Sequence, residues 1–203
     1  QIPDETVARL ALEGEQGLGE LAALLFKNRL LFDHSMDTWY RWNGQCWARC
    51  LVDEHLSELT WLQALIRSTA VRRRPKALPK GGKDGEQKKP AGQELFESLN
   101  RAADSLRNLK MRDHVLRFAA AGDFGLGMTG EEWDQNAEWL LPCPNGVVDL
   151  RTGCLRPGHP SDRLRTICPT EYEEEAQAPR FEKFIDEIIP DKDTAGFLHR
   201  LLG

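Results

Sequence analysis

The chain has 203 residues, of which 40% are hydrophobic and 29% are charged, and its formal net charge is -5. This length and this balance suit one folded domain, or one and a half, and exclude a disordered chain. No run of about 18 apolar residues occurs, and the opening QIPDETVARL lacks the features of a secretory signal, so we expect a cytoplasmic protein without a membrane span.

Two helices are predicted at the start of the chain. Asp4 is a suitable N-cap, and Val7, Leu10 and Ala11 follow at helical spacing. The segment GELAALLFKNR recovers the same period and predicts the second helix. Between the two, we expect the helical pattern to be interrupted by three glycines, Gly14, Gly17 and Gly19.

A small antiparallel sheet is predicted next. Asn43-Gly44 tolerates two positive φ values and therefore predicts a type I′ turn, with paired strands over residues 38–42 and 45–49. With residues 30–32 ahead of them, these strands form a three-stranded meander. The aromatic side chains on it (Trp39, Tyr40, Trp42 and Trp47) are either a core or a platform for single-stranded bases. We favour the core, because aromatic residues in small sheets usually pack across strands.

Two long helical stretches flank a linker. Residues 53–74 carry apolar side chains at spacings of three and four, and Pro75 stops that helix. Residues 75–92 contain three prolines and four glycines, which is linker composition, and we expect them to be mobile or disordered. Residues 93–122 predict a second helical stretch, broken near residues 108–110 and ended by Gly122.

Positive charge is concentrated at the end of the first long helix and in the linker. Residues 71–90 contain eight Lys or Arg against Asp84 and Glu86, a net charge of +6, which leaves -11 for the other 183 residues. Local potential steers phosphates whatever the overall charge is. A flexible, solubilising insertion is the alternative. Candidate DNA-binding residues are Arg72, Arg73, Arg74, Lys76, Lys80, Lys83, Lys88 and Lys89.

The last quarter predicts a hairpin and two helices. A strand over residues 146–150 turns at Thr152-Gly153 and pairs with Cys154 and Leu155, while residues 166–169 are a candidate extra strand. Pro179 opens a helix that runs to residue 189, and residues 194–202 begin the next. The fold class is therefore α+β, helix-rich, with two small antiparallel sheets: a domain over residues 1–175 and a helical tail over residues 176–203.

The remaining reactive side chains predict no metal or catalytic site. Five cysteines, an odd number, argue against a disulfide framework, and Cys46 and Cys50 near His55 lack the second pair of a zinc site. Asp149 and Arg151 are expected to form an ion pair that fixes the hairpin. The five histidines are scattered, and the cluster of Glu171, Glu173, Glu174 and Glu175 is expected to be solvated.

Five ordered segments carry a family resemblance: WYRWNGQCW, LLPCPNGVVDLRTGCLRP, ICPTEY, AQAPRFEKFIDEI and FLHRLLG. In this order they resemble the N-terminal domain that precedes the ATPase of phage, plasmid and poxvirus primase-helicases. The resemblance implies a primase upstream, where one is present, and a superfamily 3 helicase of the AAA+ type downstream. The chain ends within the apolar run FLHRLLG, so we expect it to be a piece of such a protein.

We therefore expect a non-catalytic collar or spacer that couples the ATPase ring to upstream modules and offers its basic stretch to DNA. No G-x-x-x-x-G-K-[ST] loop occurs, so ATP and Mg²⁺ are expected only in the parent protein, which the resemblance implies to be hexameric. The fragment itself is expected to be monomeric or weakly associated. Two alternatives remain, a protein-binding adaptor without DNA contact and a metal-dependent nucleotidyl transferase or nuclease fragment.

Overall fold

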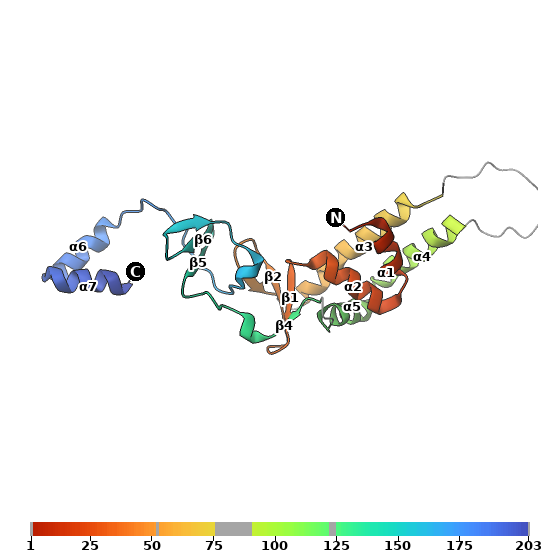
Figure 1. Cartoon of the computed structure of the whole chain (residues 1–203), viewed down its shortest axis with the longest axis horizontal. Helices are drawn as coiled ribbons and strands as arrows, with labels where there is room; N and C mark the ends of the chain where they lie inside the picture. The colour runs from red at the N-terminus through yellow and green to blue at the C-terminus, as the bar shows by residue number, and fades with distance from the viewer. Residues whose placement is uncertain (1, 52, 76–90, 122–124, 203) are drawn as a thin grey trace, which may run out of the picture.

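The computed structural model describes residues 2–51, 53–75, 91–121 and 125–202, and the lysine-rich part of the predicted linker lies outside them. Figure 1 shows an elongated chain with a helical bundle at one end, two small sheets in the middle and a helical hairpin at the other end. The two termini lie on opposite sides of the sheets. No described helix combines the length and the apolar character that crossing a bilayer requires.

Five helices form the bundle. Their apolar faces enclose a core in which Leu21, Phe26, Leu62, Leu99 and Leu116 are almost completely buried. The predicted break in the second helical stretch is confirmed, and it falls at residues 106–108. The helices are α1 (Asp4–Ala11), α2 (Gly14–Phe26), α3 (Glu54–Arg72), α4 (Ala91–Ser105) and α5 (Leu109–Ala121).

Two details of the first helices differ from the prediction. Pro3, not Asp4, is the N-cap of α1, and the Asp4 side chain is held instead by Arg72 on α3. Of the three glycines expected to interrupt the helices, only Gly14 lies at the break: residues 12 and 13 are not helical, and Gly14 begins α2 with a φ of 73°. Gly17 and Gly19 lie inside α2. A Cβ on Gly19 would lie 2.4 Å from the Cβ of Phe118, so this glycine allows α2 and α5 to pack closely.

The first sheet has the strand order β3-β2-β1-β4. The predicted meander is confirmed in β1 (Leu30–Asp33), β2 (Thr38–Trp42) and β3 (Trp47–Arg49). The fourth strand, β4 (Gly127–Met128), pairs in parallel with β1, so the expectation of a purely antiparallel sheet is wrong here. The two residues of β4 are too few to show an alternating strand pattern, and its partner β1 lies almost 100 residues away in the sequence.

The turn between β2 and β3 is not the predicted type I′ turn. Pairing starts at Trp42 and Trp47, so four residues form the loop, and only Gly44 of the Asn43-Gly44 pair has a positive φ, of 110°. The Asn43 side chain accepts hydrogen bonds from the backbone N–H groups of Gln45 and Cys46, at 3.0 and 2.9 Å. Asparagine therefore stabilises the loop through its side chain rather than through a left-handed backbone.

The second sheet contains the predicted hairpin. Its strands, in the order β5-β6-β7, are β5 (Leu140–Cys143), β6 (Gly146–Asp149) and β7 (Cys154–Arg156). The extra strand expected over residues 166–169 is absent from this described region. Cys168 donates one backbone hydrogen bond to Pro142, at 2.8 Å, but Pro169 has no N–H with which to continue a ladder.

The predicted helical tail is confirmed as α6 (Pro179–Ile188) and α7 (Lys192–Leu202). These helices bury Ile185 and Ala195 but leave Phe184 and Phe197 more than half exposed. Short 3-10 turns, η1 (Gly130–Glu132) and η2 (Pro160–Asp162), complete the described elements. The α+β, helix-rich class is therefore confirmed.

Candidate nucleic-acid interface

The basic end of α3 is anchored to the first turn of α1. Arg72 donates two hydrogen bonds to Asp4, from Nε to Oδ2 at 2.8 Å and from Nη2 to Oδ1 at 2.7 Å. The side-chain hydrogen bond from Arg72 lowers the pKa of Asp4 below its usual value. Each residue also lies at the favourable end of its helix dipole, the carboxylate at an N-terminus and the guanidinium at a C-terminus. Arg72 is therefore held in a fixed position.

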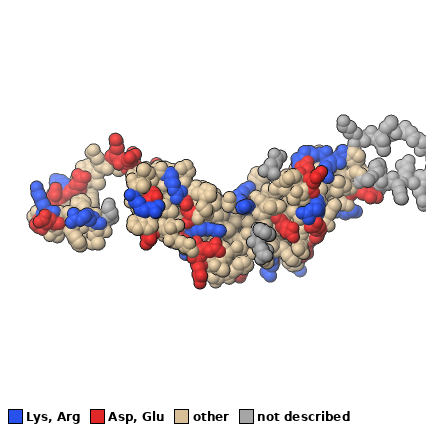
Figure 2. Space-filling model, in the orientation of Figure 1, with Lys and Arg blue, Asp and Glu red and all other residues tan. Residues whose placement is uncertain are grey.

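The next two arginines also contact the bundle. Arg73 lies 3.8 Å from Glu5, and the guanidinium of Arg74 lies over the ring of Phe96 on α4, 5.4 Å from its centroid. Figure 2 shows Lys and Arg atoms gathered at this end of α3, beside acidic atoms. The other candidate DNA-binding residues lie outside the described residues: Lys76, Lys80, Lys83, Lys88 and Lys89.

Most of the aromatic side chains of the meander form a core, as expected. Tyr40 and Trp47 are buried and pack with Trp133, a residue that follows β4. Trp42 is half-buried against Trp47. Trp39 lies on the opposite face of the sheet, half-buried between Phe32 and His55. These rings pack mainly against one another, so the meander does not offer the open stack of rings that a platform for bases would need.

A different tryptophan is exposed. Trp61 on α3 is 60% exposed, and the guanidinium of Arg29 lies 5.8 Å from its ring centroid. Arg29 and Arg41 both contact the buried carboxylate of Glu58, at 3.1 and 3.7 Å. The sequence did not predict this cluster. The one signal it offered was that Trp61 lies outside the apolar stripe of α3. Arg29 and Arg41 come together because Leu30 pairs with Arg41 across β1 and β2.

Two histidines that seemed scattered in the sequence line one cavity. His34 and His55 share a hollow of about 460 Å³ with Asp37, Asp113 and Arg117. The Nδ1 atom of His55 is buried without a hydrogen-bond partner, and desolvation by burial lowers the pKa of this imidazole. His34 bonds instead to the carbonyl of Ala120, at 3.2 Å. Within the described ranges, no three His, Cys, Asp or Glu side chains are grouped so that they could hold a metal ion.

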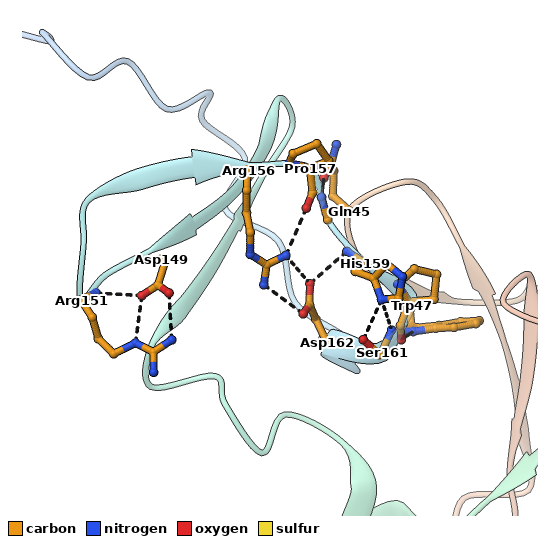
Figure 3. Close-up of polar contacts among 11 residues, drawn as sticks. Gln45, Trp47, Asp149, Arg151, Arg156, Pro157, His159, Ser161 and Asp162 are labelled. Carbon is orange, nitrogen blue, oxygen red and sulfur yellow. Dashed lines mark hydrogen bonds and ion pairs between the residues drawn. The ribbon is translucent and has the colours of Figure 1, made fainter.

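The hairpin of the second sheet is fixed by ion pairs (Figure 3). Asp149 accepts three hydrogen bonds from Arg151, including one from the side-chain Nη2 at 2.8 Å, and the side-chain bonds lower the pKa of Asp149 to about 2. The ion pair expected from the sequence is therefore confirmed. On the adjacent strand, Arg156 makes a bidentate pair with Asp162, at 2.8 and 2.9 Å.

The segment after this hairpin ties the second sheet to the first. Gly158 donates its backbone N–H to the side chain of Gln45, and the indole of Trp47 donates to the carbonyl of Pro160, both at 2.9 Å. The motif NGVVDLRTG itself forms β6 and the turn to β7, with Asp149 and Arg151 paired at that turn. The acidic cluster is exposed, as expected: Glu171, Glu173, Glu174 and Glu175.

The fold is an α+β module that combines a helical bundle with two small sheets, and three consecutive arginines stand at the end of α3. The family model described as D5 N terminal like matches residues 20–190. The chain therefore belongs to the D5 N-terminal-like family, the pre-helicase domain of primase-helicase proteins, which is not itself known as catalytic. No curated protein matches the chain.

Proposed function

We propose that this chain is a non-catalytic collar or spacer of a mobile-element primase-helicase, and that it contacts DNA through the basic end of α3. Its membership of a pre-helicase family supports the place in the replication protein. The elongated arrangement supports the spacer role, because the bundle and the helical hairpin lie at opposite ends (Figure 1). The two sheets could therefore keep a module at the bundle end of the chain apart from a module at the hairpin end.

The observation that carries the DNA contact is the placement of three consecutive arginines at one helix end. Arg72, Arg73 and Arg74 are oriented by Asp4, Glu5 and Phe96, and the sequence adds five lysines within the next fifteen residues. Each phosphate that such a surface neutralises releases counterions, a gain that needs no reading of base sequence. The contact is accordingly weak, directed at the backbone and sensitive to salt.

The helical hairpin supports a contact with a neighbouring module. Helices of ten or eleven residues are marginal in isolation, and α6 and α7 leave Phe181, Phe184 and Ile188 substantially exposed. In this proposal that face packs against a downstream AAA+ helicase, and a primase, where present, lies upstream. ATP and Mg²⁺ belong to the helicase of a hexameric parent protein, and this chain takes no chemical step.

Retention of duplex DNA by the 203-residue chain tests the proposal. We expect measurable binding of a labelled 30-base-pair duplex at 50 mM salt and a steep loss of affinity towards 200 mM, with no dependence on sequence. A chain that acts only as a protein-binding adaptor would bind no DNA even at the lowest salt. Turnover of nucleotides or DNA by the isolated chain with a divalent metal would instead establish an enzyme and contradict the proposal.

A further inference from the structure

The large indole ring of Trp61 is exposed to solvent, although α3 is otherwise a well-packed helix. Its neighbours Leu59 and Leu62 are completely buried, whereas Trp61 is 60% exposed. A single exposed apolar residue is common and needs no explanation by itself. Trp61, however, has the guanidinium of Arg29 over its ring, 5.8 Å from the centroid. This pairing orients the indole and brings a positive charge beside a flat, accessible surface.

A buried carboxylate holds a second guanidinium next to the first. Glu58 contacts Arg29 at 3.1 Å and Arg41 at 3.7 Å, and its side chain is only 10% exposed. Glu54 holds the other side of Arg41, at 2.8 Å. Both arginine side chains remain nearly half exposed. Since each guanidinium carries five N–H donors in a rigid fork, each has donors beyond those that these contacts use.

We propose that Trp61, Arg29 and Arg41 form a binding site for single-stranded nucleic acid. A base stacks on the indole of Trp61, and the adjacent phosphate accepts hydrogen bonds from the two guanidinium groups. Bases within a duplex are already stacked and paired, so the site selects single strands. This inference rests on the DNA contact proposed above. It adds a surface for base stacking to the phosphate contact at the basic end of α3.

The position of the site on α3 favours nucleic acid over a protein partner. Trp61 and Arg72 are eleven residues apart, which places them about 16 Å apart along the helix and about 20° apart around it. Both side chains are exposed on α3. A strand of a few nucleotides can therefore follow one face of α3 from the ring of Trp61 to the basic end. If Trp61 and Arg29 were instead a hot spot for a protein partner, Trp61 would not need to be aligned with Arg72 along α3.

The second sheet provides a matched control. Trp139 is 43% exposed and has Arg151 6.0 Å from its ring centroid, so the pair resembles Trp61 and Arg29. The Arg151 guanidinium, however, is occupied by Asp149 through both Nε and Nη2. No second arginine is held beside Trp139 in the described contacts. Trp139→Ala thus removes an exposed indole without removing the proposed site.

Fluorescence anisotropy with a labelled 20-nucleotide oligothymidylate and a duplex of equal length tests the site. We expect Trp61→Ala to weaken single-strand binding about tenfold and duplex binding less than about twofold, since stacking contributes about 1–3 kcal/mol per base. Trp61→Phe keeps a ring and should stay within about threefold of the unsubstituted chain. Trp139→Ala should change neither affinity, and circular dichroism checks that each variant is folded.

Two results would overturn the inference while leaving the DNA contact of α3 intact. One is single-strand affinity that Trp61→Ala does not change, which is also the result expected if Trp61 binds a protein. The other is an equal loss for single-stranded and duplex DNA. If the unsubstituted chain binds neither form at 50 mM salt, the proposed function itself fails, and the stacking site fails with it.

Discussion

Trp133 donates its indole N–H to the buried carboxylate of Asp33 at 2.8 Å, across 100 residues of sequence. Ser35 completes the site, because its backbone N–H and its hydroxyl both donate to the other carboxylate oxygen, at 2.9 and 2.6 Å. Asp33 lies at the end of β1, beside β4, and is completely buried. The contact therefore fixes the segment after β4 to the first sheet.

Replacing Trp133 with Phe should destabilise the chain by about 1–3 kcal/mol, because one oxygen of a buried carboxylate loses its donor. Urea unfolding measures this loss. Trp139→Phe is the control, since Trp139 is partly exposed and a surface change of this kind stays within about 0.5 kcal/mol. Equal stabilities of the two variants would show that the hydrogen bond to Asp33 contributes nothing.

Asp33 also makes the stability of the folded chain depend on pH. Burial raises the pKa of Asp33, but the hydrogen bonds from Ser35 and Trp133 outweigh it and hold the pKa below the usual value. Because the folded pKa is lower than the ordinary aspartate value of 3.8, this stabilisation is complete above about pH 4 and disappears as the pH falls through the folded pKa. Trp133→Phe should reduce the loss of stability in that acidic range, and an unchanged pH profile would argue against the assignment.

Gly19 and Gly196 should respond differently to replacement by alanine. A methyl group on Gly19 would meet the Cβ of Phe118 at 2.4 Å and the carbonyl oxygen of Val115 at 3.1 Å, so we expect Gly19→Ala to cost about 1–3 kcal/mol. Gly196 on α7 has its nearest neighbour, the end of the Arg200 side chain, at 3.8 Å. Gly196→Ala should raise helix content without lowering the urea midpoint. Equal midpoints for both variants would contradict close packing of α2 and α5.

The Asp149 carboxyl should titrate at about pH 2, because its hydrogen bonds with Arg151 favour the ionised form. Carbon-13 NMR of the carboxyl group measures this directly. Arg151→Gln should move the titration midpoint upward towards the ordinary value of 3.8. A midpoint near 4 in the unsubstituted chain would show that the pair is not formed in solution.

The sequence predicted elements with a strong local signal and missed contacts that depend on register. The apolar spacing along α3 and the Thr-Gly turn after β6 are local, and both elements were found within a few residues of their bounds. The parallel strand β4 and the loop at Asn43 were not predicted correctly. A strand of two residues is too short to show an alternating pattern, and the turn type depends on which residues of β2 and β3 pair. The same holds for the cluster at Trp61, which requires Arg41 to lie opposite Leu30.

The salt dependence of duplex binding, compared between two triple variants, tests the proposed DNA contact most directly. One variant replaces Arg72, Arg73 and Arg74 with Gln, and the other removes three charges from the tail through Arg180→Gln, Lys183→Gln and Lys192→Gln. Each phosphate contact contributes about -0.9 to the slope of log Kobs against log salt concentration. We expect the arginine variant to flatten the slope by about 2 to 3 and the tail variant to leave it unchanged. Identical slopes for both variants and the unsubstituted chain would contradict a DNA contact at the end of α3.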